Sequence, residues 1–230
     1  MKTIGMIGGM SWESSLEYYR IVNQAVKERL GGFHSAKCVL YSVDFEEIER
    51  FQHQGDWAAA TDVLVDAAQR VERAGAEILL ICTNTMHLMA EAVAESVDIP
   101  LLHIVDATAE DILTRGQNTV GLLGTRFTME QDFYKGRLLA KHGIDVLIPE
   151  EEERKTIHGI LYNELCLGEI RKTSQDDFRR IIESLQERGA EGIILGCTEI
   201  PLLVDQADYD LPLYDTTALH ARASVTQALT

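Results

Sequence analysis

Short runs of apolar, β-rich residues alternate along the chain with longer stretches in which apolar residues recur at helical spacing. This alternation is typical of a parallel sheet covered by helices on both faces, because parallel strands are joined by long crossover connections. The expected strands lie at residues 3–7, 37–43, 77–81, 101–104, 120–123, 146–149, 192–195 and 211–214, and the expected helices at residues 13–29, 58–74, 106–115, 128–141, 174–188 and 217–229. The sequence therefore predicts an α/β fold.

The chain also repeats itself. Three pairs of similar runs occur in the same order, at Thr3 and Thr119, at Ala76 and Ala190, and around Pro100 and Pro212. Their offsets of 116, 114 and 112 residues are nearly constant, which favours duplication over chance likeness between strand–turn–helix units. The last pair extends to Asp106-Ala-Thr-Ala and Asp215-Thr-Thr-Ala. We expect two pseudo-symmetric halves, each a parallel four-stranded sheet flanked by helices, with a boundary between residues 104 and 105.

Composition limits the partners of this fold. Apolar residues make up 46% of the chain and charged residues 25%, as in ordinary globular proteins. The formal net charge of −16 repels phosphate backbones and anionic lipid surfaces, so neither nucleic acid nor membrane is an expected partner. A small acidic substrate would have to be bound by a local cluster of donors, because the overall field opposes it.

The sequence lacks the patterns of export and of metal binding. The chain enters an apolar strand without a basic leader, and no apolar run approaches the roughly 20 residues needed to cross a bilayer. The four cysteines are too sparse for a disulfide scaffold and form no C-x-x-C pair, and the histidines form no H-E-x-x-H motif. We expect a cytoplasmic protein with reduced thiols and without a bound metal.

Polar clusters follow two strands that occupy equivalent places in the repeat. Cys82-Thr83-Asn84-Thr85-Met86-His87 follows the strand at 77–81, and Gly196-Cys197-Thr198-Glu199 follows the strand at 192–195. In α/β folds, ligands bind at the carboxyl ends of the strands. We expect a thiol in such a cluster to lie near a helix start, whose dipole and free amides lower its pKa below the free value of about 8.5. Thiolate, the form that acts as base or nucleophile, is then available near neutral pH.

Three runs resemble the aspartate/glutamate racemase family: Gly8-Gly9-Met10-Ser11-Trp12-Glu13-Ser14, Asn84-Thr85-Met86-His87, and Leu195-Gly-Cys-Thr-Glu-Ile-Pro-Leu-Leu203. The resemblance covers nearly the whole chain and is strongest to bacterial racemases specific for L-aspartate and L-glutamate. It implies catalysis without pyridoxal phosphate or another cofactor, by two groups that exchange the Cα proton on opposite faces of the substrate. It also implies an active site in the cleft between the halves, and a homodimer is possible.

The resemblance also bears on the domain boundaries. Pattern alone would place the last helix with the second half, whereas the family likeness joins it to the first. The expected halves are then residues 1–104 together with the C-terminal helix 216–230, and residues 105–215.

The chain departs from the family pattern at one catalytic position. The family usually has Cys directly before Asn-Thr, whereas this chain has Thr83 there and Cys82 one residue earlier. On an extended segment a one-residue step turns the side chain to the opposite face, so Cys82 is expected to be a buried structural residue. Cys197 matches the other catalytic cysteine. The resemblance therefore implies Cys197 as the base facing the L-enantiomer and Thr83 as the opposite proton donor.

Further residues are candidates for binding the substrate. The amides and side chains expected near its carboxylates belong to Met10, Ser11, Asn84, Thr85, Thr198 and Glu199. Gln52 and Arg50 are candidates for the distal carboxylate, although Arg50 also fits a solvated helix charge beside an acid. Asn and Thr at these positions also fit helix caps, and His87 fits a residue that orients its loop.

Two other functions fit the same residues. One is a related carbanion enzyme, such as a hydantoin racemase or an arylmalonate-type decarboxylase, for which an apolar pocket would replace the donors to a second carboxylate. The other is a non-catalytic amino-acid-binding protein, which the loss of a cysteine at Thr83 would permit. Exchange of the Cα proton with solvent distinguishes binding from catalysis.

Overall fold

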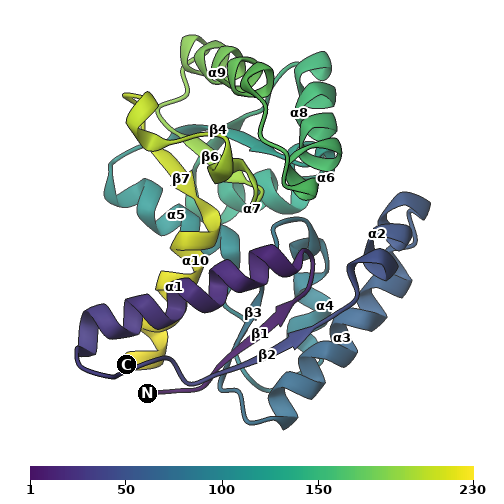
Figure 1. The fold of residues 1–230 in the computed structure, drawn as a ribbon, viewed down its shortest axis with the longest axis vertical. Helices are drawn as coiled ribbons and strands as arrows, with labels where there is room; N and C mark the ends of the chain where they lie inside the picture. Colours follow the sequence, from purple (N-terminus) through teal and green to yellow (C-terminus); the bar gives the residue numbers. More distant parts are fainter. The chain divides into compact units, whose positions relative to one another are not determined.

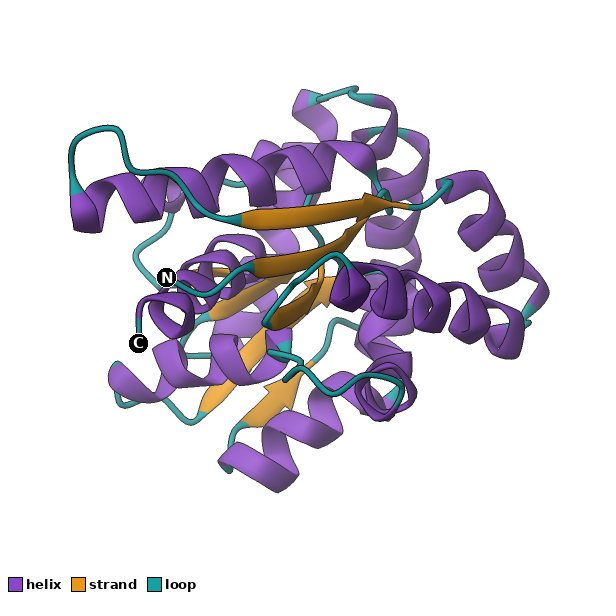
Figure 2. Ribbon diagram, turned by 90° about the horizontal axis from the view of Figure 1, so that it is seen from below, coloured by secondary structure: helices purple, strands orange, loops and turns teal.

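The computed structural model describes residues 1–230, which form two compact units. The first comprises Met1–Ile104 and Thr217–Thr230, and the second comprises Val105–Thr216. Each contains a parallel sheet with flanking helices, which confirms the predicted α/β class (Figures 1 and 2).

The sheet of the first unit has the strand order β2-β1-β3. Its strands are β1 (Ile4–Gly8), β2 (Cys38–Ser42) and β3 (Ile78–Ile81), and its helices are α1 (Trp12–Leu30), α2 (Phe45–Gln54), α3 (Trp57–Arg73), the 3-10 helix η1 (Thr85–Met89), α4 (Ala90–Glu95) and α10 (Thr216–Leu229). Side chains alternate across this sheet, as the pleat of a strand requires. Ile4 and Met6 pack with α1 and α10, whereas Ile7 packs with α2, α3 and α4.

The sheet of the second unit has four strands in the order β5-β4-β6-β7. They are β4 (Thr119–Gly124), β5 (Asp145–Leu147), β6 (Ile193–Gly196) and β7 (Leu213–Asp215), and the helices are α5 (Ile104–Thr114), α6 (Arg126–Glu130), α7 (Asp132–His142), α8 (Glu151–Asn163) and α9 (Lys172–Glu187), with 3-10 helices η2 (Leu165–Leu167), η3 (Ile200–Leu202) and η4 (Gln206–Asp208). Gly121 lets α9 approach the sheet, because a Cβ there would lie 3.0 Å from a methyl carbon of Leu185.

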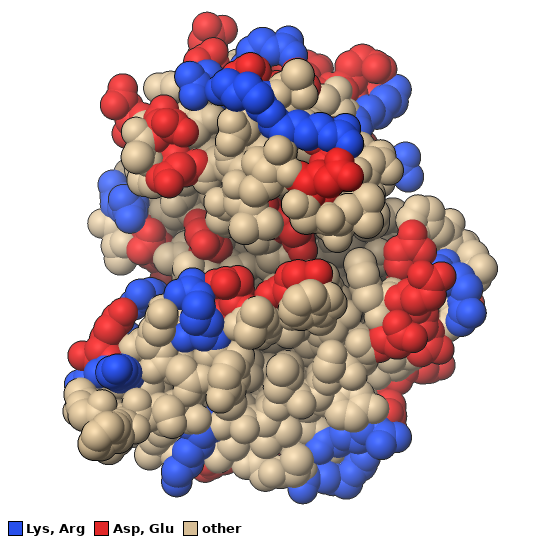
Figure 3. Space-filling view, in the orientation of Figure 1, with Lys and Arg blue, Asp and Glu red and all other residues tan.

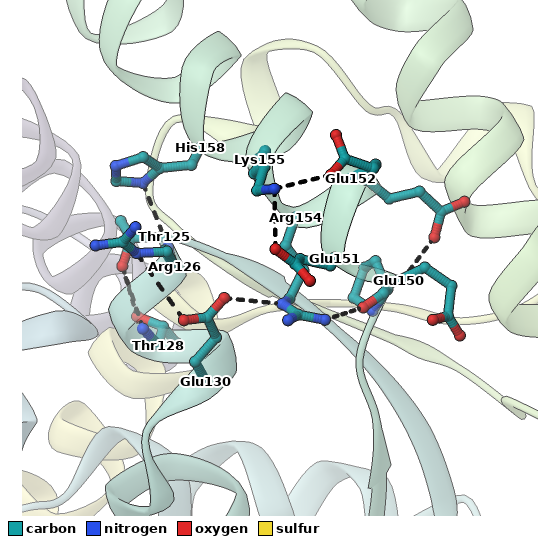
Figure 4. Close-up of polar contacts among 12 residues, drawn as sticks. Thr125, Arg126, Thr128, Glu130, Glu150, Glu151, Glu152, Arg154, Lys155 and His158 are labelled. Atoms are coloured by element: carbon teal, nitrogen blue, oxygen red, sulfur yellow. Dashed lines mark hydrogen bonds and ion pairs between the residues drawn. The ribbon is translucent and has the colours of Figure 1, made fainter.

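Polar contacts hold the short helix α6 that follows β4 (Figure 4). The hydroxyl of Thr125 caps it by accepting a hydrogen bond from the Thr128 amide at 3.2 Å. His158 Nδ1, on α8, accepts from the Arg126 amide at 3.3 Å, and the Arg154 guanidinium donates to the Glu130 carboxylate at 3.0 Å. These contacts fasten α6 to α8.

The two units share a hydrogen-bond pattern beneath their central strands. In the first, the Glu77 amide donates to the Thr3 carbonyl at 2.8 Å, and the Glu77 carboxylate accepts from the Thr3 amide at 2.7 Å. In the second, Glu191 makes the same two bonds with Thr119, at 2.9 and 3.1 Å. These residues belong to the runs that predicted the duplication, so the repeat extends to specific hydrogen bonds.

The predicted fourth strand of the first unit is wrong. Only a single parallel bridge forms, between Leu79 and Leu101. The segment leaves the sheet early because α5 begins at Ile104, whose amide donates to a histidine side chain, Nε2 of His87, rather than to a strand. The start of α5 also shows that Asp106 and Asp215 are not equivalent, since Asp106 lies inside α5 and Asp215 ends β7.

Several predicted helix boundaries are also wrong. The expected helix at 128–141 is two helices, because Gln131 is extended and separates α6 from α7. Helices α2, α4 and α8 were absent from the expected elements, although the sequence allowed a helix around Arg50. Acidic residues lie in the first turn of α2, after Asp44, and in the first turn of α8, after Glu150, where the helix dipole favours them. That signal was present in the sequence.

The surface carries acidic and basic side chains over both units, and acidic side chains gather over α2 (Figure 3). The acidic residues of α2 are Glu46, Glu47 and Glu49, and its N-cap is Asp44. No helix combines the length and apolar character that a membrane span requires.

Helix α10 is fixed in the first unit by a buried histidine as well as by apolar packing. Ala221, Val225 and Ala228 lie in the core beside α1, while His220 Nε2 contacts the Leu102 carbonyl at 2.8 Å and Nδ1 contacts the Tyr18 hydroxyl at 2.8 Å. Because a carbonyl only accepts, Nε2 carries the proton and Nδ1 accepts from Tyr18. Burial lowers the pKa of His220 from 6.5 to about 4.

This depressed pKa predicts a pH-dependent stability. Between pH 6.5 and about 4 the unfolded chain binds a proton at His220 that the folded chain does not, so the free energy of unfolding falls as the pH falls, by up to about 3 kcal/mol. His220→Gln keeps a donor for Leu102 but cannot titrate. Urea denaturation across this range should therefore show a shallower pH dependence for His220→Gln, whereas equal slopes would contradict the assignment.

Candidate active site

The parallel register places Thr83 and Cys197 at equivalent points of their units. In the first unit Ile7 pairs with Ile81, and in the second Leu123 pairs with Leu195. Thr83 and Cys197 each lie two residues beyond the second member of the pair, just after the carboxyl end of β3 or β6. The sequence repeat therefore corresponds to an equivalence of the two strand ends, one carrying a hydroxyl and the other a thiol.

Cys82 lies in the core of the first unit. It is fully buried, belongs to the core formed with α1 and α10, and donates its amide to the Ile7 carbonyl at 2.9 Å. Burial raises the pKa of its thiol far above the ordinary value. These contacts give Cys82 a structural environment, whereas Thr83, the next residue, is partly exposed.

Cys197 is partly exposed and interacts with a buried carboxylate. Its thiol donates to Glu199 Oε2 at 3.0 Å, and the Thr198 hydroxyl donates to the same oxygen at 2.7 Å. Desolvation, followed by the charge of Glu199 and an interaction with Cys166, raises the pKa of the Cys197 thiol well above its ordinary value.

This raised pKa overturns the expectation of a lowered one. The prediction placed a helix start at the thiol, but β6 is followed by a turn and then by η3, a three-residue 3-10 helix beginning at Ile200. The nearest charge is the Glu199 carboxylate, which disfavours a second anion beside it. The thiol is therefore neutral at rest, with a proton acceptor already in contact.

Several predicted binding residues of the first unit gather around η1. Gln52 is buried on α2, and its Nε2 donates to the Met86 sulfur at 3.1 Å. Met10 belongs to the same core cluster as Met86, and Thr85 is buried on η1. Asn84 precedes η1 and is buried, but its side chain does not cap the helix. The fold thus brings Gln52 to η1, which follows the loop that carries Thr83, and places Met10 in the core cluster that includes Met86.

Polar groups of the loop between β1 and α1 form hydrogen bonds that hold the loop and the start of α1 in place. The Ser11 hydroxyl caps α1 by accepting from the Ser14 amide at 3.3 Å, and the Gly9 amide donates to the Ser15 hydroxyl at 2.7 Å. Gly9 has φ +92°, and a Cβ there would lie 2.2 Å from the Val43 carbonyl oxygen. The close approach of the Val43 backbone therefore explains the glycine at this position, and a nucleotide site is not needed to explain it.

Arg50 does not lie among the predicted binding residues around η1. It is exposed on α2, and its guanidinium lies 5.1 Å from the centre of the Phe51 ring. With the acidic residues of α2 around it, this placement matches the solvated helix charge that the sequence also allowed.

His87 is a contact of Thr83 that was absent from the predicted site. Its Nδ1 lies 2.8 Å from the Thr83 carbonyl oxygen and its Nε2 lies 3.2 Å from the Ile104 amide. The four-residue spacing from Thr83 was readable in the sequence, but the contact with Ile104 depends on the fold. No group of three or more His, Cys, Asp or Glu side chains has the arrangement of a metal site.

Comparison with known proteins identifies the family. Residues 7–224 match the Asp/Glu/hydantoin racemase family model. A crystal structure of a candidate Asp/Glu racemase from Yersinia pestis is 54% identical, covers 100% of both chains and superimposes with a TM-score of 0.95. An aspartate racemase homologue from Pyrococcus horikoshii OT3 is 37% identical, again over 100% of both chains, with a TM-score of 0.87.

A more distant relative is a broad-specificity amino-acid racemase of Bacillus subtilis, which is 24% identical over 72% of this chain and 71% of its own. The family match spans both units and includes both strand-end clusters. The chain therefore belongs to the Asp/Glu/hydantoin racemase family.

Proposed function

We propose that the protein racemises an acidic amino acid, aspartate or glutamate, without a cofactor, by removing and returning the proton at Cα. The observation that carries this proposal is the equivalence of Thr83 and Cys197 at the ends of β3 and β6. Family membership supports the reaction, and the likeness to Asp/Glu racemase relatives supports the substrate class. The reaction requires Thr83 and Cys197 to reach opposite faces of one substrate.

In the proposed reaction Glu199 activates Cys197. The thiol proton passes from Sγ to Glu199 Oε2, across the observed 3.0 Å contact, and leaves a thiolate. The thiolate then takes the Cα proton of the L-enantiomer and leaves a carbanion on the substrate. Thr198 donates to the same carboxylate oxygen and so holds Glu199 in place beside the thiol.

Thr83 supplies the second proton. Its hydroxyl donates to the opposite face of the carbanion, which inverts Cα and leaves an alkoxide. The Thr83 alkoxide then regains a proton from solvent, and Glu199 releases to solvent the proton that it took from the Cys197 thiol. A hydroxyl donates to a carbanion more readily than it abstracts a proton, so conversion from the D-enantiomer should be slow. Microscopic reversibility forbids a one-way reaction, so the bias lies in relative binding and in slow reverse chemistry.

Binding of the substrate is proposed for the groups beside these two residues. Asn84, Thr85 and Thr198 adjoin the proton-transfer groups, and the amides of Met10 and Ser11 lie at the start of α1, where the helix dipole favours a carboxylate. Gln52, which contacts η1 through Met86, is the better placed of the two candidates for the distal carboxylate.

The first test is a chiral assay with L-aspartate and L-glutamate in the absence of pyridoxal phosphate. The parent chain should form the D-enantiomer and exchange the Cα proton with solvent. Cys197→Ala should reduce both rates by at least about 100-fold, because it removes a general base. Cys82→Ala is the matched control and should retain both. No exchange by the parent, or equal loss in the two variants, would contradict the proposal.

The role of Glu199 predicts opposite changes in two measurements. Glu199→Gln removes a charge that raises the pKa of Cys197, so alkylation of that thiol by iodoacetamide at neutral pH should become faster. Exchange at Cα should nevertheless fall by about 100-fold, because the acceptor of the thiol proton is lost. Exchange that rises together with alkylation would show that Glu199 only suppresses the thiolate.

The role of Thr83 is tested by separating exchange from inversion. Thr83→Ala should stop formation of the D-enantiomer, while Cys197 continues to exchange the α-proton of the L-enantiomer. Thr83→Cys restores a group that can abstract a proton, so turnover of D-aspartate or D-glutamate should rise by at least about tenfold. An unchanged rate of inversion in Thr83→Ala, with D-enantiomers inert in Thr83→Cys, would assign the second proton to another group.

A further inference from the structure

Three imidazole rings are buried together in the first unit. They belong to His87 on η1, His103 just before α5 and His220 on α10, and each is less than one-tenth exposed. The His87 ring centre lies 4.6 Å from that of His103 and 5.7 Å from that of His220. Buried imidazoles require specific hydrogen-bond partners, so their contacts define what the cluster holds in place.

The hydrogen bonds of His87 define its tautomer. The Thr83 carbonyl can only accept, so Nδ1 carries a proton and donates to it at 2.8 Å. The Ile104 amide can only donate, so Nε2 is unprotonated and accepts from it at 3.2 Å. His87 is therefore a neutral imidazole that bridges the Thr83 carbonyl and the start of α5.

His220 holds the other end of the short segment from Leu102 to Ile104. It donates from Nε2 to the Leu102 carbonyl and accepts at Nδ1 from Tyr18 on α1. The segment from Leu102 to Ile104 is thus attached to α10 and α1 by one histidine and to Thr83 by the other. Packing of the His87 and His220 rings connects the two attachments.

Thr83 needs such support because the sheet no longer holds it. The pairing of β3 with β1 ends at Ile81, and the Cys82 amide makes the last bond from this segment to β1, at 2.9 Å from the Ile7 carbonyl oxygen. One residue later the Thr83 carbonyl accepts from a side chain rather than from a strand. The direction of the Thr83 peptide, and with it the position of the hydroxyl, therefore depends on His87.

We propose that His87 is a positioning residue for Thr83, which holds the hydroxyl where it can protonate one face of the substrate carbanion. This inference rests on the proposed function of Thr83. It predicts that His87 is required for inversion but not for proton exchange by Cys197, because Cys197 is held by a different unit of the chain. A misplacement of about 1 Å can cost about 100-fold in rate, so loss of one hydrogen bond is sufficient for a measurable effect.

Two substitutions at His87 test its two hydrogen bonds one at a time. The amide nitrogen of Asn can occupy the place of Nδ1, so His87→Asn keeps a donor for Thr83. The terminal amide of Gln reaches the place of Nε2, so His87→Gln keeps a partner for Ile104 and loses the donor to Thr83.

With L-aspartate and L-glutamate in deuterated water, His87→Gln should lower D-enantiomer formation by about 100-fold and leave deuterium exchange into the L-enantiomer within about threefold. His87→Asn should restore inversion to within about tenfold of the parent.

His220→Gln is the matched control, because it perturbs the same buried cluster without touching the Thr83 carbonyl. It should lower exchange and inversion by the same factor, if it lowers either. Equal loss of exchange and inversion in His87→Gln, or loss of inversion in His87→Asn as large as in His87→Gln, would overturn the proposal. Absence of Cys197-dependent exchange in the parent would instead overturn the proposed function.

A measurement without turnover tests the geometry itself. Long-range proton–nitrogen NMR correlation on chain labelled with nitrogen-15 histidine distinguishes the two neutral tautomers, and the signal lost in His87→Asn identifies His87. The proposal requires the Nδ1-protonated form. A proton on Nε2 would contradict it whether or not the chain acts on any amino acid.

Discussion

Parallel pairing of β1 with β3, and of β4 with β6, fixes the position of the side chain that we propose for proton transfer in each unit. Ile81 pairs with Ile7 in the first unit, and Leu195 pairs with Leu123 in the second. Because the register of each pair is fixed, the residue two positions after Ile81 or Leu195 lies at the equivalent point of its unit. Thr83 occupies that point in one and Cys197 in the other. The proposed acid–base pair, its bias between enantiomers and the need for supporting groups all depend on this equivalence.

The two positions are supported in different ways. Cys197 has a charged partner two residues later in the chain, and Thr198 donates to the same carboxylate oxygen. We propose that this local group controls the thiol proton. Thr83 has no comparable charge beside it, and its backbone is bonded to His87, which bridges to Ile104. A thiol needs a neighbour that takes its proton, whereas a hydroxyl that only donates needs a fixed position. The sequence difference between the two units thus matches the different roles that we propose for Thr83 and Cys197.

Much of this arrangement was predictable from the sequence. The strand pattern and the repeats at Thr3 and Thr119 gave the α/β class and the equivalent strand ends, because both depend on local periodicity. The pKa of Cys197 was predicted in the wrong direction, since it depends on where the Glu199 side chain turns and on which helix follows β6. The bridge from His87 to Ile104 joins residues 17 positions apart, and no local pattern reports it.

The central claim is that two different residues transfer protons on opposite faces of one substrate. Its most direct measurement is the isotope content of the first D-enantiomer formed from protiated L-aspartate or L-glutamate in deuterated water, before appreciable reversal. If Cys197 removes the proton and Thr83 supplies another, this earliest product carries solvent deuterium at Cα in full. Retention of the substrate's own proton in the D-enantiomer would show that a single group carries it between faces, and would contradict the account.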